Sequence, residues 1–127
     1  MFRRVIAAVS ALLLLMSVVH AQVPRNFPAD ALRGSMVIGE VPEILLNAKP
    51  ARLGPGVRIR DQGNLQPRPA ALIGMTFLVH YTVDTQGLVK DVWILTPEEA
   101  ARKPWPATVR EAQAWKFDAV AQTWSKP

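Results

Sequence analysis

Histidine is the side chain best suited to acid–base chemistry near neutral pH, and after the N-terminal 21 residues the chain holds only His80. A catalytic role would require a nucleophile and an orienting carboxylate beside it. The serines in this part of the chain are Ser35 and Ser125, and neither lies in a nucleophile-elbow pattern. We therefore predict no catalytic residue and interpret His80 as a surface or cross-strand histidine.

The acidic residues and glycines form no recognisable metal or phosphate site. The chain has no cysteine, and its acids are dispersed. The segment Asp61–Asn64 is too short for a calcium loop, and the separation of Asp84 and Asp91 suits turn and solvent roles rather than paired acid catalysis. The run Gly54-Pro55-Gly56 lacks the Lys-Ser/Thr ending of a phosphate-binding loop. The sequence thus predicts a non-enzymatic protein without metal or cofactor.

Four tryptophans are many for a chain of 127 residues. One interpretation is an anchoring surface for a partner, to which Trp105, Trp115 and Trp124 would belong. The other is that Trp93 is a core strand residue and that one or two tail tryptophans staple the tail onto the fold. We favour the second, because a small core gains much from each buried indole. Of the four, Trp124 is the one expected to be exposed as an anchor.

The N-terminus has the features of a secretory signal peptide. A basic start, Met-Phe-Arg-Arg, precedes the apolar run Val5–Val19, and small residues stand at positions −3 and −1 of a cut between Ala21 and Gln22. The alternative, a retained membrane anchor, needs roughly 20 apolar residues, and this run is shorter. We predict cleavage, a periplasmic or secreted protein, and no stable membrane span after cleavage.

Basic residues outnumber acidic ones, giving a formal net charge of +5, but they are scattered. Because Arg58 and Arg60 stand two apart, they would share one face of a strand, and we consider them candidate partner-binding residues. A nucleic-acid footprint is normally a denser stripe of Lys and Arg. We predict no nucleic-acid binding, and expect a partner to be a periplasmic or envelope protein.

The strongest structural pattern is a β-hairpin over residues 73–95. Apolar residues alternate with polar ones from Phe77 to Val83, with Leu78 as the exception, which is typical of a half-buried strand. The turn cluster Asp84–Gly87 follows, and its glycine can adopt positive φ at no steric cost. The chain then returns as a second strand over 88–95.

Shorter strands are expected over 33–41, 43–47 and 57–60, with turn signals between most of them and a loop or sharp corner at Gly54-Pro55-Gly56. Five short strands predict a mainly β fold: a small antiparallel meander or partly open barrel of OB-like or SH3-like outline. The expected organisation is a signal peptide over 1–21, an extended lead-in over 22–32, a β domain over 33–96, and a short helix with a loosely ordered tail over 97–127.

The tail opens with a helix signature. Thr96, Pro97 and Glu99 form a capping box with proline at N1, and Pro104 ends a helix of about two turns. The capping pattern repeats before a second short helix expected over 107–115. Residues 118–127 are expected to be loose apart from the tryptophan.

Two resemblances bear on function. The run Leu53–Asp61, the segment Val79–Asp84 with Gly87, and Val92–Leu95 resemble a family of small, exported, uncharacterised bacterial proteins over about residues 28–100. This resemblance implies export and no particular activity.

The second resemblance covers about residues 67–119 and is to the C-terminal domain of TonB-type energy transducers. Pro69–Gly74, Val83-Asp84, the strand 89–95 and Trp115-Lys-Phe117 follow that domain's order, although Asp118 stands where proline is usual. It implies an α+β fold that contacts an outer-membrane partner by strand addition. The TonB-like fold requires a helix of two to four turns across the sheet, whereas the barrel requires paired strands before residue 65.

The signal-peptide prediction is tested by the N-terminus of the protein as cells export it. We expect a chain that begins at Gln22, measured by mass spectrometry of the intact protein from the periplasmic or culture fraction. A membrane-bound chain that still begins at Met1 would instead support the retained anchor.

Overall fold

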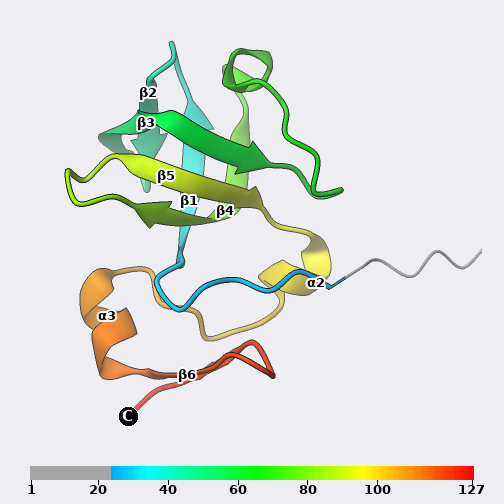
Figure 1. Cartoon of the computed structure of the whole chain (residues 1–127), viewed down its shortest axis with the longest axis vertical. Helices are drawn as coiled ribbons and strands as arrows, with labels where there is room; N and C mark the ends of the chain where they lie inside the picture. Colours follow the sequence, from blue (N-terminus) through cyan, green and yellow to red (C-terminus); the bar gives the residue numbers. More distant parts are fainter. Residues whose placement is uncertain (1–23) are drawn as a thin grey trace, which may run out of the picture.

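Five strands form a closed barrel in the computed structural model, which describes residues 24–127 (Figure 1). The segment of the predicted signal peptide and its cleavage site, Ala21/Gln22, lies outside the described residues. Within 24–127, no helix is long and apolar enough to cross a membrane. The strands are β1 (Leu32–Ile38), β2 (Glu43–Leu46), β3 (Lys49–Arg60), β4 (Thr76–Val83) and β5 (Val89–Ile94).

The strands follow one another around the barrel in the order β1-β2-β3-β5-β4, and β4 pairs with β1 to close it. All neighbours are antiparallel except β3 and β5, which run parallel. This is the strand order of an OB-type barrel, so the predicted mainly β, five-stranded barrel is confirmed. It is closed and mixed, whereas a partly open, wholly antiparallel sheet was expected.

The α+β alternative is wrong, because β1, β2 and β3 are paired before residue 65 and no helix among residues 24–127 is longer than the six residues of α3 (Val109–Ala114). The parallel pair arises because β5, which follows β4 as a hairpin, inserts between β4 and β3. The sequence signal of a hairpin determines only the pairing of its own two strands. The pattern over 73–95 therefore did not predict that β5 also pairs with β3.

The barrel interior is filled by the inward residues of every strand. On β4 the side chains of Phe77, Val79 and Tyr81 point into this core, as their alternation predicted. Met36 and Ile38 from β1 and Val92 from β5 are fully buried beside them. The outward residues of the same strands are therefore free to form a second, separate surface.

Turn geometry agrees with the turn residues. Gly87 adopts φ of 81°, and the Asp84 carboxylate accepts hydrogen bonds from the backbone N–H groups of Gln86 and Leu88. The expected corner at Gly54-Pro55-Gly56 is instead an irregularity inside the long strand β3, where the register with β5 shifts between Leu53 and Arg58. Proline and glycine are tolerated at such a bulge because the ladder hydrogen bonds are interrupted there.

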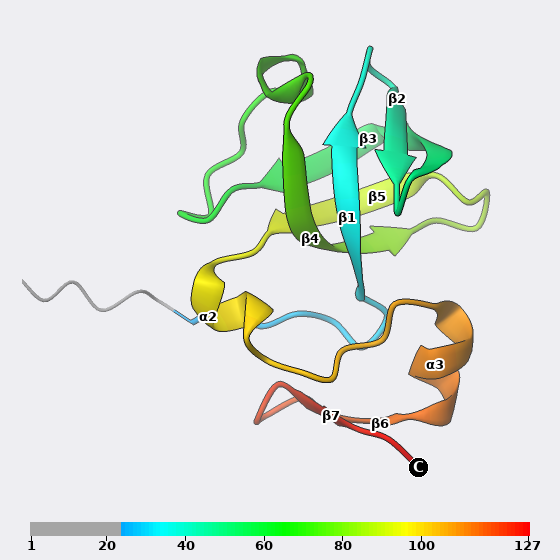
Figure 2. The same cartoon turned by 180° about the vertical axis from the view of Figure 1, so that it is seen from behind.

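The segment that follows β5, residues 95–127, packs beneath the barrel as a second layer (Figures 1 and 2). A 3-10 turn, η3 (Pro69–Leu72), precedes β4, and two short helices follow β5: α2 (Pro97–Ala100), with the capping box that was predicted, and α3 (Val109–Ala114). The expected loose tail is a hairpin of β6 (Lys116–Asp118) and β7 (Thr123–Ser125). The alternation in these three-residue strands is too short to be recognised in sequence.

The lead-in runs between the barrel and this second layer (Figure 2). Phe27 and Ala31 are buried in a second apolar cluster with Leu95, Trp105 and Trp124. The lead-in, expected to be extended, is thus anchored in this cluster through Phe27 and Ala31, whereas the three residues between them are exposed. The prediction of an exposed Trp124 is wrong, because only 5% of this residue is exposed.

Trp105 joins the two layers. Its indole Nε1 donates a hydrogen bond to the Ala31 carbonyl at 2.9 Å, and its ring contacts Phe27, Phe117 and Trp124. The interpretation that tail tryptophans staple the tail onto the fold agrees with this packing. Its other part is wrong, because Trp93, expected in the core, lies half-buried on the outer face of β5.

We expect Trp105→Ala to lower the free energy of unfolding by about 3–5 kcal/mol, because it leaves a cavity between the layers. Trp115→Ala is the matched control: Trp115 is only half-buried, so its loss should be clearly smaller. Urea denaturation followed by circular dichroism measures both. Equal losses would show that the second layer does not depend on Trp105.

Candidate functional site: an arginine-lined face and groove

The outer face of the barrel carries a row of large polar and aromatic side chains across four strands. The strand registers place Arg60 beside Trp93, Trp93 beside His80, and His80 beside Arg33. These residues come from β3, β5, β4 and β1 in turn. One end of the row is covered by the lead-in and the second layer, and the other end faces solvent.

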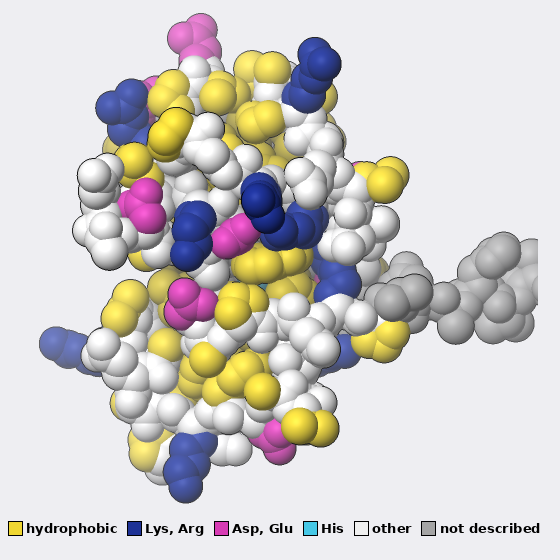
Figure 3. All heavy atoms as spheres, in the orientation of Figure 1, with side chains coloured by type: hydrophobic (Ala, Val, Ile, Leu, Met, Phe, Trp, Pro, Cys, Tyr) yellow, Lys and Arg dark blue, Asp and Glu magenta, His cyan; other side chains and the backbone are white. Residues whose placement is uncertain are grey.

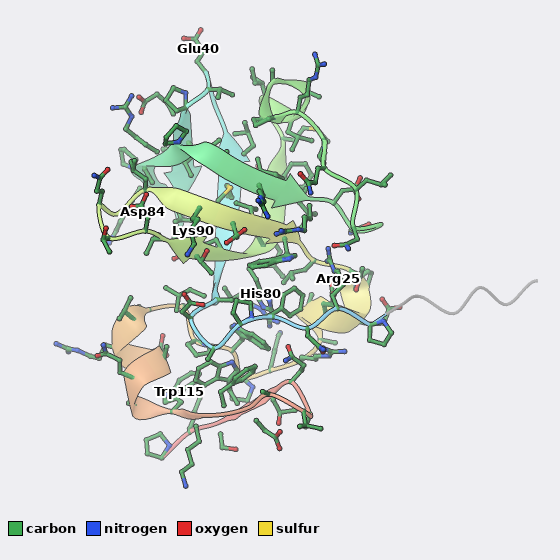
Figure 4. The ribbon with its side chains drawn as sticks, viewed as in Figure 1. Arg25, Glu40, His80, Asp84, Lys90 and Trp115 are labelled. Carbon is green, nitrogen blue, oxygen red and sulfur yellow. The ribbon has the colours of Figure 1, made fainter. Side chains whose placement is uncertain are left out.

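His80 occupies the covered part of the row, between the layers (Figure 4). Its ring stacks on Trp105 with centroids 4.1 Å apart, and the edge-to-face ring of Phe27 is 4.4 Å away. It is fully buried, so its interpretation as a cross-strand histidine agrees with the structure, whereas a surface position does not. The lead-in that buries it gave no sequence signal, because its apolar residues are too few.

Burial keeps His80 neutral. Desolvation, reinforced by the nearby positive charges of Arg33, Arg25 and Arg102, lowers the pKa of His80 to about 2. Arg33 Nε donates to His80 Nε2 at 3.2 Å, so the other ring nitrogen, Nδ1, carries the proton, and this atom has no hydrogen-bond partner. The ring acts here as a packed acceptor for a guanidinium.

The serines considered with His80 lie on separate strands. Ser35 is opposite Leu78 on the outer face of β1, and Ser125 is opposite Lys116 in the terminal hairpin. Among residues 24–127 there is no group of three His, Asp or Glu side chains that could hold a metal ion.

Arg33 ties the barrel to α2. Its guanidinium donates to the backbone carbonyls of Glu99, Ala100 and Arg102 at 2.9–3.2 Å. These carbonyls lie at the C-terminal end of the helix, where a cation is favoured. Desolvation lowers the pKa of Arg33, an effect that the Glu99 charge opposes.

A second arginine, Arg25 of the lead-in, forms a buried ion pair with Glu99. Arg25 Nε donates to the carboxylate at 2.9 Å, and its other nitrogens donate to the carbonyls of Asp61 and Ile94. Burial alone would raise the pKa of Glu99, but hydrogen bonds from Arg25 and from Thr96 outweigh it and hold that pKa below its usual value. The capping role of Glu99 was predicted, whereas its partner 74 residues away was not.

The uncovered part of the row is basic. Arg58 and Arg60 point outward from β3, as predicted from their spacing. Lys90 of the neighbouring strand β5 is exposed as well (Figure 4). Several Lys and Arg side chains gather on this face of the barrel (Figure 3). Arg60 Nη1 is 3.4 Å from Asp91 Oδ1. The guanidinium carbon of Arg60 lies over the Trp93 ring, 5.2 Å from the ring centroid. Among the described residues, Arg58 and Lys90 form no ion pair, and both are exposed.

A groove of about 1010 Å³ runs from this face towards α2, between the barrel and the lead-in. Its charged lining is Arg25, Arg60 and Arg102 together with Glu98 and Glu99, and Trp93 forms part of its wall. Arg25 is fully engaged with Glu99 and with carbonyls. Sequence reasoning missed this groove, because its charged residues are spread from position 25 to position 102.

The tail tryptophans are not part of this face. Trp105 and Trp124 are buried in the apolar cluster, and Trp115 lies in the second layer, where Lys126 approaches its ring at 5.2 Å (Figure 4). Arg58 and Arg60 are therefore the candidate partner-binding residues that the structure brings together with new ones, Lys90 and Trp93.

Comparison of the chain with protein-family models, with curated proteins and with solved structures gives no match. The two sequence resemblances therefore stay predictions, and function is inferred from the geometry of the face and the groove.

The buried neutral His80 makes stability depend on pH. The unfolded chain binds a proton at this residue below a pKa of 6.5, whereas the folded protein does not until about 2, so unfolding takes up a proton and stability falls as pH falls. We expect a loss of about 2 kcal/mol in the free energy of unfolding between pH 7 and pH 5. Urea denaturation at a series of pH values measures it.

His80→Gln supplies the control, because it removes the titrating group while keeping an acceptor for Arg33. Its free energy of unfolding should be nearly flat over the same pH range. The stability that Glu99 contributes through its lowered pKa is a separate effect, because it is present at higher pH and is lost only as the pH falls below about 4.5. An identical slope in the wild type and the variant would contradict the assignment to His80.

Proposed function

We propose that the protein is an exported, non-enzymatic binding module that recognises an acidic surface of a protein in the cell envelope. The observation that carries the proposal is the basic outer face of β3 and β5, where Arg58 and Lys90 are exposed without an acidic partner among the described residues. Unpaired, exposed charges of one sign steer the association of oppositely charged partners.

The surroundings of this face support binding rather than chemistry. The half-buried Trp93 lies beside Arg60 on the same face and offers the kind of aromatic surface that is enriched at interfaces. The neutral His80 is fully buried, so it is not available to a substrate in solution. Export is supported by the basic start, the apolar run Val5–Val19 and the small residues before Gln22.

The proposal is tested by photo-crosslinking in cells. A photoreactive amino acid at position 90 should capture an envelope protein, whereas the same group at Val120, which is 97% exposed on the terminal hairpin, should not. Arg58→Glu should reduce the position-90 adduct by about tenfold, because it reverses one charge of the face.

Arg110→Glu is the matched control, because Arg110 is an equally exposed arginine on α3. It should leave the adduct unchanged. Equal loss in the two arginine variants, or equal adducts from positions 90 and 120, would contradict a binding site on the basic face.

A further inference from the structure

The groove beside the basic face contains one arginine side chain, Arg102, that no residue of the described range 24–127 engages. Within residues 24–127, no nitrogen of the Arg102 guanidinium donates a hydrogen bond to the protein, and its Nη1 is buried from solvent. A buried guanidinium nitrogen without a partner costs free energy, and an acceptor supplied by a ligand would recover it. Arg25, in the same groove, shows the contrast, because it is fully paired with Glu99 and with carbonyls.

The charges of the groove select the ligand. Three arginines and two glutamates line it. Arg25 pairs with Glu99, and Arg60 pairs with Asp91, which lies outside the lining. Arg102 and Glu98 are therefore the lining charges without an ion-pair partner among the described residues. The exposed carboxylate of Glu98, also in the lining, would repel a polyanion. This balance favours a single carboxylate over a phosphate dianion or a polyphosphate.

Trp93 determines which group the ligand must carry next to its carboxylate. Its ring forms part of the groove wall, and Arg60 covers it at 5.2 Å. An apolar group of a ligand in the groove would pack against the part of the indole that lines it. A carboxylate of the same ligand would pair with the Arg102 guanidinium in that lining, whose planar fork suits two carboxylate oxygens.

We propose that this groove binds a carboxylate of the partner polypeptide, an acidic side chain or its C-terminus, next to an apolar or aromatic residue that packs on Trp93. This inference rests on the proposed function and names the chemistry of its partner. Arg102 is the donor to the carboxylate, and Glu98 excludes more highly charged ligands.

The test uses N-acetylphenylalanine, which carries one carboxylate and one aromatic ring, and its neutral amide, N-acetylphenylalaninamide. Both are titrated into the purified protein, and the indole N–H resonance of Trp93 is followed by NMR. We expect the acid to shift this resonance and to bind about tenfold more tightly than the amide, because a charge-assisted pair forms only with the acid.

Variants locate the site. Arg102→Gln should abolish the preference for the acid, and Arg110→Gln, which removes the same charge from α3, should preserve it. Glu98→Gln, at an exposed position, should tighten binding of the acid and weaken discrimination against phenyl phosphate. Glu98→Gln keeps the test decisive if Arg102→Gln disturbs the fold. Equal affinity for acid and amide, or equal effects of the two arginine variants, would overturn the proposal.

The outcomes separate this inference from the proposed function. If the position-90 adduct forms in cells with its dependence on Arg58 but the acid shows no preference over the amide, the basic face binds a partner and the carboxylate groove is wrong. If the acid binds through Arg102 while no adduct forms at position 90, the groove stands and the envelope partner is wrong.

Discussion

The arrangement of the whole molecule depends on covering one outer face of a small barrel. The interior of the barrel is filled by its own strands, but His80 and Arg33 on the outside require burial partners from elsewhere in the chain. Phe27 from the lead-in and Trp105 from the tail enclose the imidazole, and the indole holds the second layer in place. A neutral ring and a carbonyl-bound guanidinium are tolerated there because each is hydrogen-bonded or stacked.

Local sequence patterns predicted the parts of the fold that depend on neighbours in the chain. The strand over 77–83, the glycine turn and the capping box at Thr96 each follow from rules that span a few residues, and each was found in place. The half-buried character of that strand was wrong, because His80 and Thr82 on its outer face are buried as well, while Val83 is exposed. The barrel class was predicted by counting such strands. The parallel β3–β5 pair and the terminal hairpin were not predicted, because pairing between distant segments leaves no local periodicity in the sequence.

The candidate site was the least predictable part for the same reason. The spacing of Arg58 and Arg60 indicated a shared face, and the structure adds Trp93 to it from another strand. The link between Arg25 and Glu99 spans most of the barrel sequence, and only the fold brings them together. Trp124 was expected outside because it stands near the end of the chain, although an apolar terminal residue gains free energy wherever a covering layer can accept it.

The hydrogen bonds between Phe27 and Gln122 join residues 95 positions apart. The lead-in therefore docks fully only when the turn between β6 and β7 has reached its place beneath the barrel. Closing a loop of this length costs conformational entropy, which the buried contacts at Phe27 must offset. The two segments are thus coupled: loosening the β6–β7 hairpin also loosens the lead-in that covers His80.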